Sequence, residues 1–186
     1  APVELNAPKR SLLNAQPPAP VSSRSVTNSH IVGTVMGALA QFDGEDVPAA
    51  GGQSYRHLMK FSNPDDGSQQ VLFDGMFGGA GASNIKNTPI EAIEEEYPVR
   101  VTRYELAPDT AGAGRYRGGH GTIRTYEVLR PTEVQLAGER FRFGPYGLDG
   151  GQAGAPGSAR YLPADDDARE LSSKANFRAG PGDRFR

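Results

Sequence analysis

The fold of this chain is decided by the stretch Glu96-Tyr-Pro-Val-Arg-Val-Thr-Arg-Tyr-Glu-Leu-Ala-Pro-Asp-Thr-Ala-Gly-Ala-Gly-Arg-Tyr-Arg-Gly-Gly-His-Gly-Thr-Ile-Arg-Thr-Tyr-Glu-Val-Leu129. Two runs that are rich in β-branched and aromatic residues flank a segment rich in glycine, which is the pattern of two strands joined by a loop. Arginines and tyrosines are interleaved along the whole stretch. It therefore predicts two strands joined by a glycine-rich turn, with arginine and tyrosine side chains along the whole stretch.

Glycine and proline punctuate the rest of the chain in the same way. The 186 residues include 24 glycines and 15 prolines, whereas about 12% of an average protein is glycine or proline. These residues lie between hydrophobic runs, so they indicate turns and not disorder. We predict strands at 54–61, from 71 onward, at 98–106, 122–130, 133–143, 159–162 and 171–178, and the start of another at 184–186.

Turns and loops are predicted between these strands. The sequence Asn63-Pro-Asp-Asp-Gly67 predicts a turn before the strand that begins near residue 71. The dipeptide Pro131-Thr132 predicts a tight turn that pairs strands 122–130 and 133–143 as a hairpin. Small residues at 75–83 and 144–157 predict two glycine-rich loops.

The first helix is predicted from Val26 to Phe42, because apolar residues recur there at helical spacing. Ser25 or Thr27 is available as its N-cap. Gly33 and Gly37 lie four residues apart and predict a close contact of this helix with a sheet or with another helix.

A second, short helix is predicted from Thr88 to about Tyr97. Thr88 is expected to cap it, Pro89 to occupy its first position and Glu91 to complete a capping box. Glu94, Glu95 and Glu96 are expected to form its solvated face.

These elements predict the α+β class: strand-dominated mixed sheets with two short helices and long Gly/Pro-rich loops. Residues 1–24 contain five prolines and are expected to be an extended lead-in segment, with residues 25–186 forming one strand-rich domain. The chain begins at Ala1 and stops as a strand begins. We therefore expect it to be the C-terminal part of a larger subunit, incomplete at both ends.

Composition narrows the possible functions. The formal net charge is −2, so there is no global attraction to nucleic acid or to anionic lipid. No cysteine is present, which excludes disulfides, thiolate metal sites and cysteine nucleophiles. No apolar run approaches the roughly 18 residues of a membrane span. We expect a cytoplasmic protein that binds neither nucleic acid nor membrane.

Several familiar catalytic motifs are absent from the sequence. Gly112-Ala-Gly114 lacks the third glycine of a dinucleotide fingerprint and precedes a strand pattern, and no Gly-Lys-Ser/Thr occurs. The chain is therefore not expected to bind ATP itself. No Gly-x-Ser-x-Gly elbow is present. The three histidines lack metal-ligand spacing, and Asp165-Asp-Asp167 is expected to be a solvated turn.

One histidine stands out as a candidate site residue. His120 lies between Gly119 and Gly121, where the backbone can approach a ligand closely. We expect His120, with Arg117 and Arg115, to lie near the chemistry or near a subunit seam. The alternative, a histidine that only occupies a turn, stays open.

The interleaved arginines and tyrosines also suggest a site for single-stranded nucleic acid. Against this, the overall charge is slightly negative, and the arginines of strand 98–106 point to opposite faces: Arg100 lies with Thr102 and Tyr104, and Arg103 with Val99 and Val101. Buried or interfacial arginine–carboxylate pairs explain this arrangement better than a phosphate track does.

A series of short motifs resembles the hydantoinase B / 5-oxoprolinase family in the same order along the chain. The most specific are Asn87-Thr-Pro-Ile-Glu91, Tyr97-Pro98 with Arg100, Arg103-Tyr104-Glu105-Leu106, Gly112 to Gly114 and Arg117-Gly-Gly119. The match extends toward the end of the chain through Phe143-Gly-Pro-Tyr-Gly147 and Gly154-Ala-Pro-Gly157. One departure is the short segment Ala82-Ser-Asn-Ile-Lys86, where the family carries a longer stretch. Any catalytic role of that stretch is therefore in doubt here.

The resemblance implies a subunit of an ATP-dependent enzyme that opens cyclic amides such as N-methylhydantoin or 5-oxoproline. ATP would be bound by a hydantoinase A-type partner subunit, and a divalent metal would be bound outside this segment by the rest of the subunit. The fragment alone is expected to be inactive. Two alternatives remain: a subunit of an ATP-dependent ketone carboxylase, and a non-catalytic strand-rich binding module.

Overall fold

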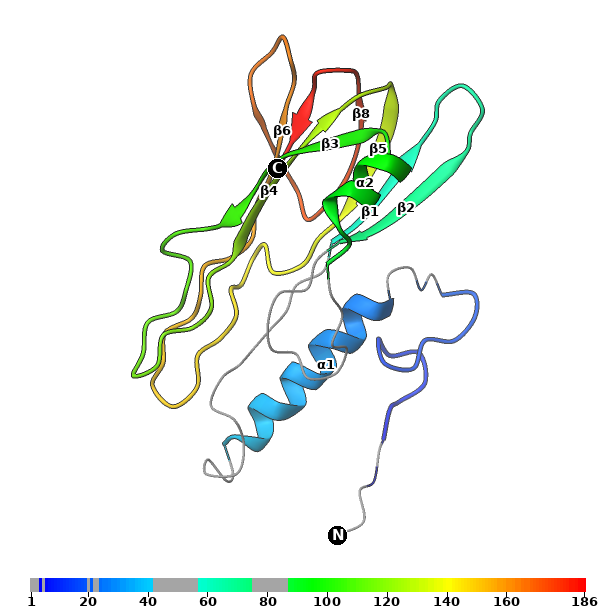
Figure 1. Cartoon of the computed structure of the whole chain (residues 1–186). Helices are drawn as coiled ribbons and strands as arrows, with labels where there is room; N and C mark the ends of the chain where they lie inside the picture. Colours follow the sequence, from blue (N-terminus) through cyan, green and yellow to red (C-terminus); the bar gives the residue numbers. More distant parts are fainter. Residues whose placement is uncertain (1–3, 5, 20, 22–23, 42–56, 75–86) are drawn as a thin grey trace.

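The computed structural model describes residues 4, 6–19, 21, 24–41, 57–74 and 87–186 (Figure 1). Its elements are α1 (Arg24–Leu39), β1 (His57–Ser62), β2 (Gln69–Asp74), α2 (Ile90–Glu96), β3 (Val99–Leu106), β4 (Thr122–Val128), β5 (Thr132–Ala137), β6 (Ala159–Leu162), β7 (Arg169–Leu171), β8 (Lys174–Ala179) and β9 (Arg184–Phe185). The predicted α+β class, in which strands outnumber helices, is confirmed. The predicted strand residues 54–56 and the predicted loop 75–83 lie outside the described residues.

The described strands form two antiparallel sheets. One has the order β2-β1-β5-β8 and the other the order β3-β4-β9-β6-β7. Their inner faces meet through aromatic rings: the ring centroids of Phe61 and Phe185 are 6.4 Å apart, and those of Phe177 and Phe185 are 5.9 Å apart. Phe61 lies on β1, Phe177 on β8 and Phe185 on β9, so a short terminal strand joins the two sheets.

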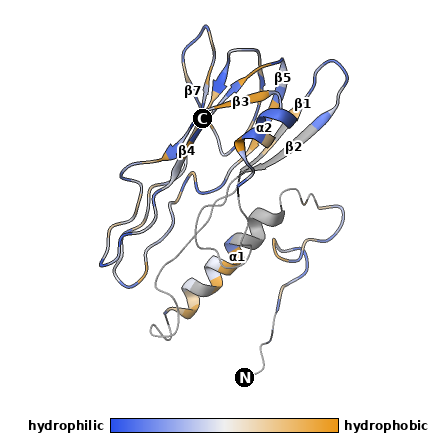
Figure 2. Ribbon diagram, viewed as in Figure 1, coloured by the Kyte–Doolittle hydropathy of each residue, from blue (hydrophilic) through white to orange (hydrophobic). Residues whose placement is uncertain are grey.

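The alternation of burial along β5 shows why this strand lies in the sandwich. Thr132, Val134 and Leu136 are buried, whereas Glu133 and Gln135 are exposed, which is the period of two expected of a strand with one face on the core. Helix α2 closes one end of the core with Ile93, which is 1% exposed. Figure 2 shows both hydrophobic and hydrophilic residues on this short helix. Glu94, Glu95 and Glu96 are exposed, as predicted.

The predicted hairpin of strands 122–130 and 133–143 is wrong. β4 pairs with β3 and β9, whereas β5 pairs with β1 and β8. The Leu129 N–H still bonds to the Pro98 carbonyl beside β3, and the Thr132 hydroxyl already donates to the Ser62 carbonyl on β1, at 3.0 Å. Residues 130 and 131 therefore cross from one sheet to the other. A short Pro-containing connection looks the same in sequence whether its strands pair or separate.

Strand β5 also ends at Ala137, and not at residue 143. Arg140 adopts a φ of 63°, a left-handed backbone that a strand cannot contain. The chain leaves the sheet here and enters the glycine-rich loop predicted from residue 144. The turn predicted at Asn63–Gly67 is confirmed, with Gly67 at a φ of 71° and its N–H bonded to the Asn63 carbonyl.

The predicted helix caps are wrong in both helices. Helix α1 begins at Arg24, so Ser25 and Thr27 lie inside it. In α2 the cap position is occupied by Pro89, and no side chain caps the helix. Thr88 and Glu91 therefore do not form a capping box. The Tyr97 N–H bonds to the Ile93 carbonyl at the other end, so the helix stops before Pro98 as expected.

Candidate functional site

Two long loops run side by side at one end of the sandwich, and we call them the loop platform: residues 107–121 between β3 and β4, and residues 138–158 between β5 and β6 (Figure 1). Thr110 organises the first loop, because its hydroxyl donates to the Ala107 carbonyl at 2.8 Å and accepts from the Gly121 N–H at 2.7 Å. The Thr110 carbonyl accepts from Ala155 N–H in the second loop, at 2.9 Å. The two loops are thus joined by their backbones.

Glycine is required where the platform loops touch. A Cβ on Gly112 would lie 2.2 Å from the Gln152 carbonyl oxygen, and one on Gly144 would lie 1.9 Å from the Gly154 carbonyl oxygen. Both neighbours are backbone atoms, so neither can move aside without distorting the loop. Gly112 and Gly144 therefore allow the close packing of backbone on backbone between the two loops.

The three predicted site residues all lie on the first loop of this platform, and all are exposed. Arg117 NH2 lies 3.7 Å from Asp109 Oδ1, and the Arg115 guanidinium lies 5.6 Å from the centre of the Tyr116 ring. Among the described residues, no hydrogen bond or ion pair holds the His120 side chain. The structure therefore places the three residues on one exposed loop, but it does not join them by contacts into an assembled site.

The arginine–carboxylate pairs of the described residues lie at the surface. The expectation of buried pairs is therefore wrong, whereas that of interfacial pairs stays a prediction. Arg103 and Glu105 pair on β3 with side chains 44% and 46% exposed. A bulge between Val101 and Arg103 shifts the register, so Arg103 leaves the face that carries the buried Val99. The Glu94 carboxylate accepts the Val101 N–H at 2.9 Å beside this bulge.

Helix α1 reaches the loop platform through contacts that the sequence predicts only in part. The Tyr146 hydroxyl donates to the Gly33 carbonyl, and a Cβ on Gly37 would lie 2.2 Å from the Tyr146 hydroxyl oxygen. The two glycines do allow a close contact, but their partner is an aromatic side chain of a loop and not a sheet or helix. Beside it, His30 Nδ1 lies 3.4 Å from Arg140 NH2.

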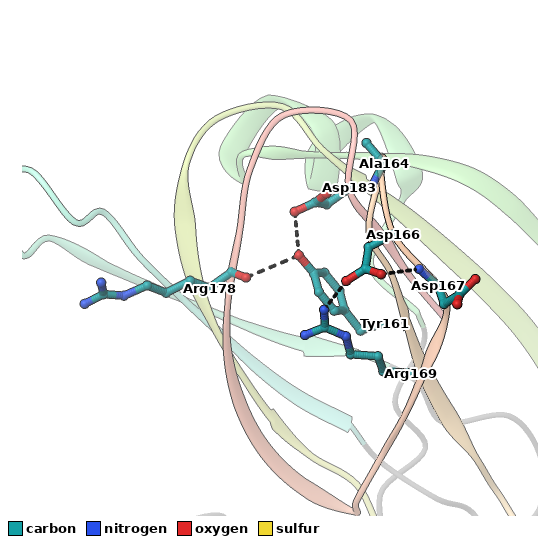
Figure 3. A network of polar contacts seen from close by, with 7 residues as sticks. All are labelled: Tyr161, Ala164, Asp166, Asp167, Arg169, Arg178 and Asp183. Atoms are coloured by element: carbon teal, nitrogen blue, oxygen red, sulfur yellow. Dashed lines mark hydrogen bonds and ion pairs between the residues drawn. The ribbon is translucent and has the colours of Figure 1, made fainter.

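A second polar cluster lies between β6 and the β8–β9 turn (Figure 3). The Tyr161 hydroxyl donates to Asp183 Oδ2 at 2.5 Å, and Asp183 also accepts the N–H groups of Ala164 and Gly180. Burial, and then the hydrogen bond to Asp183, raises the pKa of Tyr161 to about 12. No sequence signal points to this cluster beyond an aspartate in a Pro-Gly-Asp turn.

The described part of the chain contains neither a metal centre nor a membrane-spanning helix. There, no group of three or more histidine or carboxylate side chains is arranged to hold a metal ion. Nor does any described helix combine the length and apolar character needed to cross a membrane.

An open depression on the outer face of the four-stranded sheet, lined by residues such as Glu133, Gln135 and Arg178, shares no residue with the loop platform.

The motif order and this two-sheet fold lead to a family assignment. Residues 1–186 match the family model described as hydantoinase B/oxoprolinase. The chain belongs to the hydantoinase B/oxoprolinase family. This hydantoinase B/oxoprolinase chain is 33% identical to the B-type subunit of a putative D-/L-hydantoinase from Pseudomonas sp. (strain NS671), over 84% of this chain and 28% of that protein.

Two further comparisons show what else this chain is similar to. An uncharacterized protein of Methanocaldococcus jannaschii is 33% identical over 95% of this chain and 33% of its own length. The crystal structure of an ATP-dependent caprolactamase from Pseudomonas jessenii has the same fold, with a TM-score of 0.64 and 20% identity over 97% of this chain and 35% of that one. The chain thus spans about a third of the length of each of these proteins.

Proposed function

We propose that this chain is part of a hydantoinase B-type subunit of an ATP-dependent cyclic amide hydrolase that opens N-methylhydantoin or 5-oxoproline rings. The family match over residues 1–186 carries the proposal. The Pseudomonas relative named as a hydantoinase component supports it, and so does the fold shared with a caprolactamase described as ATP-dependent.

The proposed reaction breaks the ring C–N bond of an amide. ATP phosphorylates the amide oxygen and releases ADP, and a first water then adds to the activated carbon, so that the ring C–N bond breaks and the nitrogen takes a proton. A second water hydrolyses the resulting acyl phosphate, so the sum is one ATP and two waters giving ADP, phosphate and the ring-opened acid. An unstrained amide is a poor electrophile, and phosphorylation of its oxygen provides the leaving group that the reaction needs. The glycine motif at Gly112 and Gly114 packs against a neighbouring loop, so we assign ATP to a hydantoinase A-type partner subunit.

The described residues do not fit a metal centre, because no group of three ligating side chains meets among them. We therefore assign the divalent metal of the proposed enzyme to the rest of the subunit, outside this segment. In the same proposal, residues 25–186 are its strand-rich domain and residues 1–24 lead into it. The lack of cysteines favours a cytoplasmic location.

Within this chain, we propose that His120, with Arg117 and Arg115, faces either the substrate or the seam with the partner subunit. Three observations support this. The residues share one exposed loop, that loop is held in place by backbone bonds to its neighbour, and conformationally defined loops on a rigid scaffold commonly carry function.

The function is tested by purifying the full-length subunit together with a hydantoinase A-type subunit. ADP release and ring-opened product are measured with N-methylhydantoin and with 5-oxoproline, with and without ATP. Product that depends on both ATP and the two subunits supports the proposal. Bicarbonate-dependent consumption of a ketone would replace it by the carboxylase alternative, and a lack of both reactions would leave a binding module.

A further inference from the structure

Helix α1 is attached to the loop platform at one small contact region. Tyr146 projects from the second loop onto the helix, where its hydroxyl bonds to the Gly33 carbonyl and its ring fills the space beside Gly37. Gly37 is buried, whereas Val35 and Leu39 on the same helix are 51% and 48% exposed. Together with the neighbouring contact between His30 and Arg140, this region attaches the described part of α1 to the second loop of the platform, so a loss of these contacts would loosen the helix from the platform.

The second contact of this region fixes the protonation state of a histidine. An arginine guanidinium has only N–H donors and keeps its charge at any ordinary pH, so Arg140 NH2 must donate to His30 Nδ1 across the 3.4 Å between them. Nδ1 can accept only when it carries no proton. The docked arrangement therefore requires neutral His30 with its proton on Nε2.

The charges around His30 oppose its protonation. Burial, followed by the Arg140 guanidinium, holds the pKa of His30 below its usual value, and Lys174 on β8 acts in the same direction. Glu139 on the platform opposes them, but its carboxylate is shared with Lys174 Nζ at 2.7 Å. Arg140 is itself poorly compensated, because its buried Nε has no hydrogen-bond partner among the described residues.

We propose that His30 and Arg140 form a pH-sensitive latch that holds helix α1 on the loop platform while His30 is neutral and releases the helix when His30 is protonated. Protonation removes the acceptor at Nδ1 and brings a second cation against Arg140. The docked state is then fully favoured above about pH 6.5 and is weakened as the pH falls below that value, because a group with a lowered pKa in the docked state binds its proton more tightly when released. The proposal does not depend on the proposed enzymatic function.

Release of α1 has an observable consequence for its backbone. A helix of 16 residues is only marginally stable by itself in water, so undocking exposes its amides to exchange. Amide hydrogen exchange of residues 31–39, measured by mass spectrometry on the full-length subunit, therefore reports the latch directly. Protection at pH 7.5 and pH 5.0 is compared after correction for the intrinsic pH dependence of exchange.

Two substitutions and one control make the test decisive. His30→Asn keeps an acceptor near the Nδ1 position but cannot be protonated, and His30→Lys places a permanent cation beside Arg140. His120→Asn removes an exposed histidine of the same loop platform. The amides of β4 and β5 in the same samples show whether each variant is folded.

In the wild type and in His120→Asn, we expect protection of α1 to fall by about tenfold at pH 5.0, and by no more than about 30-fold, because the released histidine titrates near pH 6.5. His30→Asn should keep its protection at both pH values. His30→Lys should show low protection at both. Equal protection of the wild type at the two pH values, or an equal loss in His30→Asn, would overturn the latch. The comparison of the wild type with His30→Asn decides the question even if His30→Lys does not fold.

Discussion

The Tyr161 hydroxyl lies 2.5 Å from Asp183 Oδ2 and donates a hydrogen bond to it, which fastens strand β6 to the turn between β8 and β9. The hydrogen bond favours the charged form of Asp183 and the neutral form of Tyr161. Burial alone would raise the pKa of Asp183, but the hydrogen bonds from Tyr161, Gly180 and Ala164 outweigh it and lower that pKa. The charged carboxylate and the neutral phenol therefore belong to the folded state.

Asp183→Ala should destabilise the protein by about 2 kcal/mol, because it removes the acceptor of two N–H groups and leaves the Tyr161 hydroxyl only its longer bond, 3.3 Å, to the Arg178 carbonyl. Urea denaturation at pH 7 measures this change. Asp165→Ala removes the same charge from an exposed position and should change the stability by less than about 0.5 kcal/mol. Equal losses in both variants would show that charge, and not the hydrogen bonds, is responsible.

The high pKa of Tyr161 predicts a loss of stability at alkaline pH. A pKa raised from 10.0 to about 12 in the folded state stabilises the fold fully below pH 10, and this contribution is lost as the pH rises from 10 to 12. Tyr161→Phe lacks the titrating group, so its stability should fall less steeply over this range than that of the wild type. Urea midpoints at pH 9 and pH 11 test this, and parallel slopes would contradict it.

Phe61 is the core residue whose loss should cost most. It is 1% exposed on β1 and contacts Tyr97 and Phe185 across the interface between the sheets. Phe61→Ala should therefore destabilise the protein by about 3–5 kcal/mol. Phe143→Ala, at a position that is 67% exposed, removes the same side chain at little cost. If Phe61→Ala and Phe143→Ala had the same thermal midpoint, the proposed core would be wrong.

Gly37→Ala tests the contact between α1 and Tyr146. The added methyl group would displace the Tyr146 ring and break its bond to the Gly33 carbonyl. Overpacking costs about 1–3 kcal/mol, whereas replacing a helical glycine by alanine gains about 1 kcal/mol, so a net loss of about 1 kcal/mol is expected in urea denaturation. Gly119→Ala, where an added Cβ meets nothing within 4 Å, is the control. A gain in stability for Gly37→Ala would mean that Tyr146 does not pack there.

His120→Ala tests the proposed site in the complete two-subunit enzyme. We expect turnover to fall by about 100-fold, the low end of what a proton-transfer group contributes, with little change in the thermal midpoint because the side chain is exposed. Asn176→Ala, an exposed change on the outer sheet face, is the matched control. An unchanged rate for His120→Ala would remove this residue from the site.

Local patterns in the sequence are enough to find most of the strands. The alternation along β5, the β-branched runs of β3 and β4 and the turn at Asn63–Gly67 depend on neighbouring residues only. The positions of loops can also be predicted from the sequence, because glycine and proline determine the backbone conformations available at their own positions. The position of His120 between two glycines places it correctly on a loop, but its chemical role depends on groups that spacing does not specify.

The sequence by itself therefore determined the α+β class, the strand-rich pattern and the glycine-rich loop from residue 144, since each follows from local backbone preferences and hydrophobic period. Only the tertiary structure decided which strands pair, because pairing depends on contacts between residues that are distant in the chain. It alone separated β4 from β5 into different sheets, brought Tyr161 to Asp183 and placed Tyr146 against Gly33 and Gly37. The contact of His30 with Arg140 was decided in the same way, since the two residues lie 110 positions apart in sequence and meet only in the folded chain.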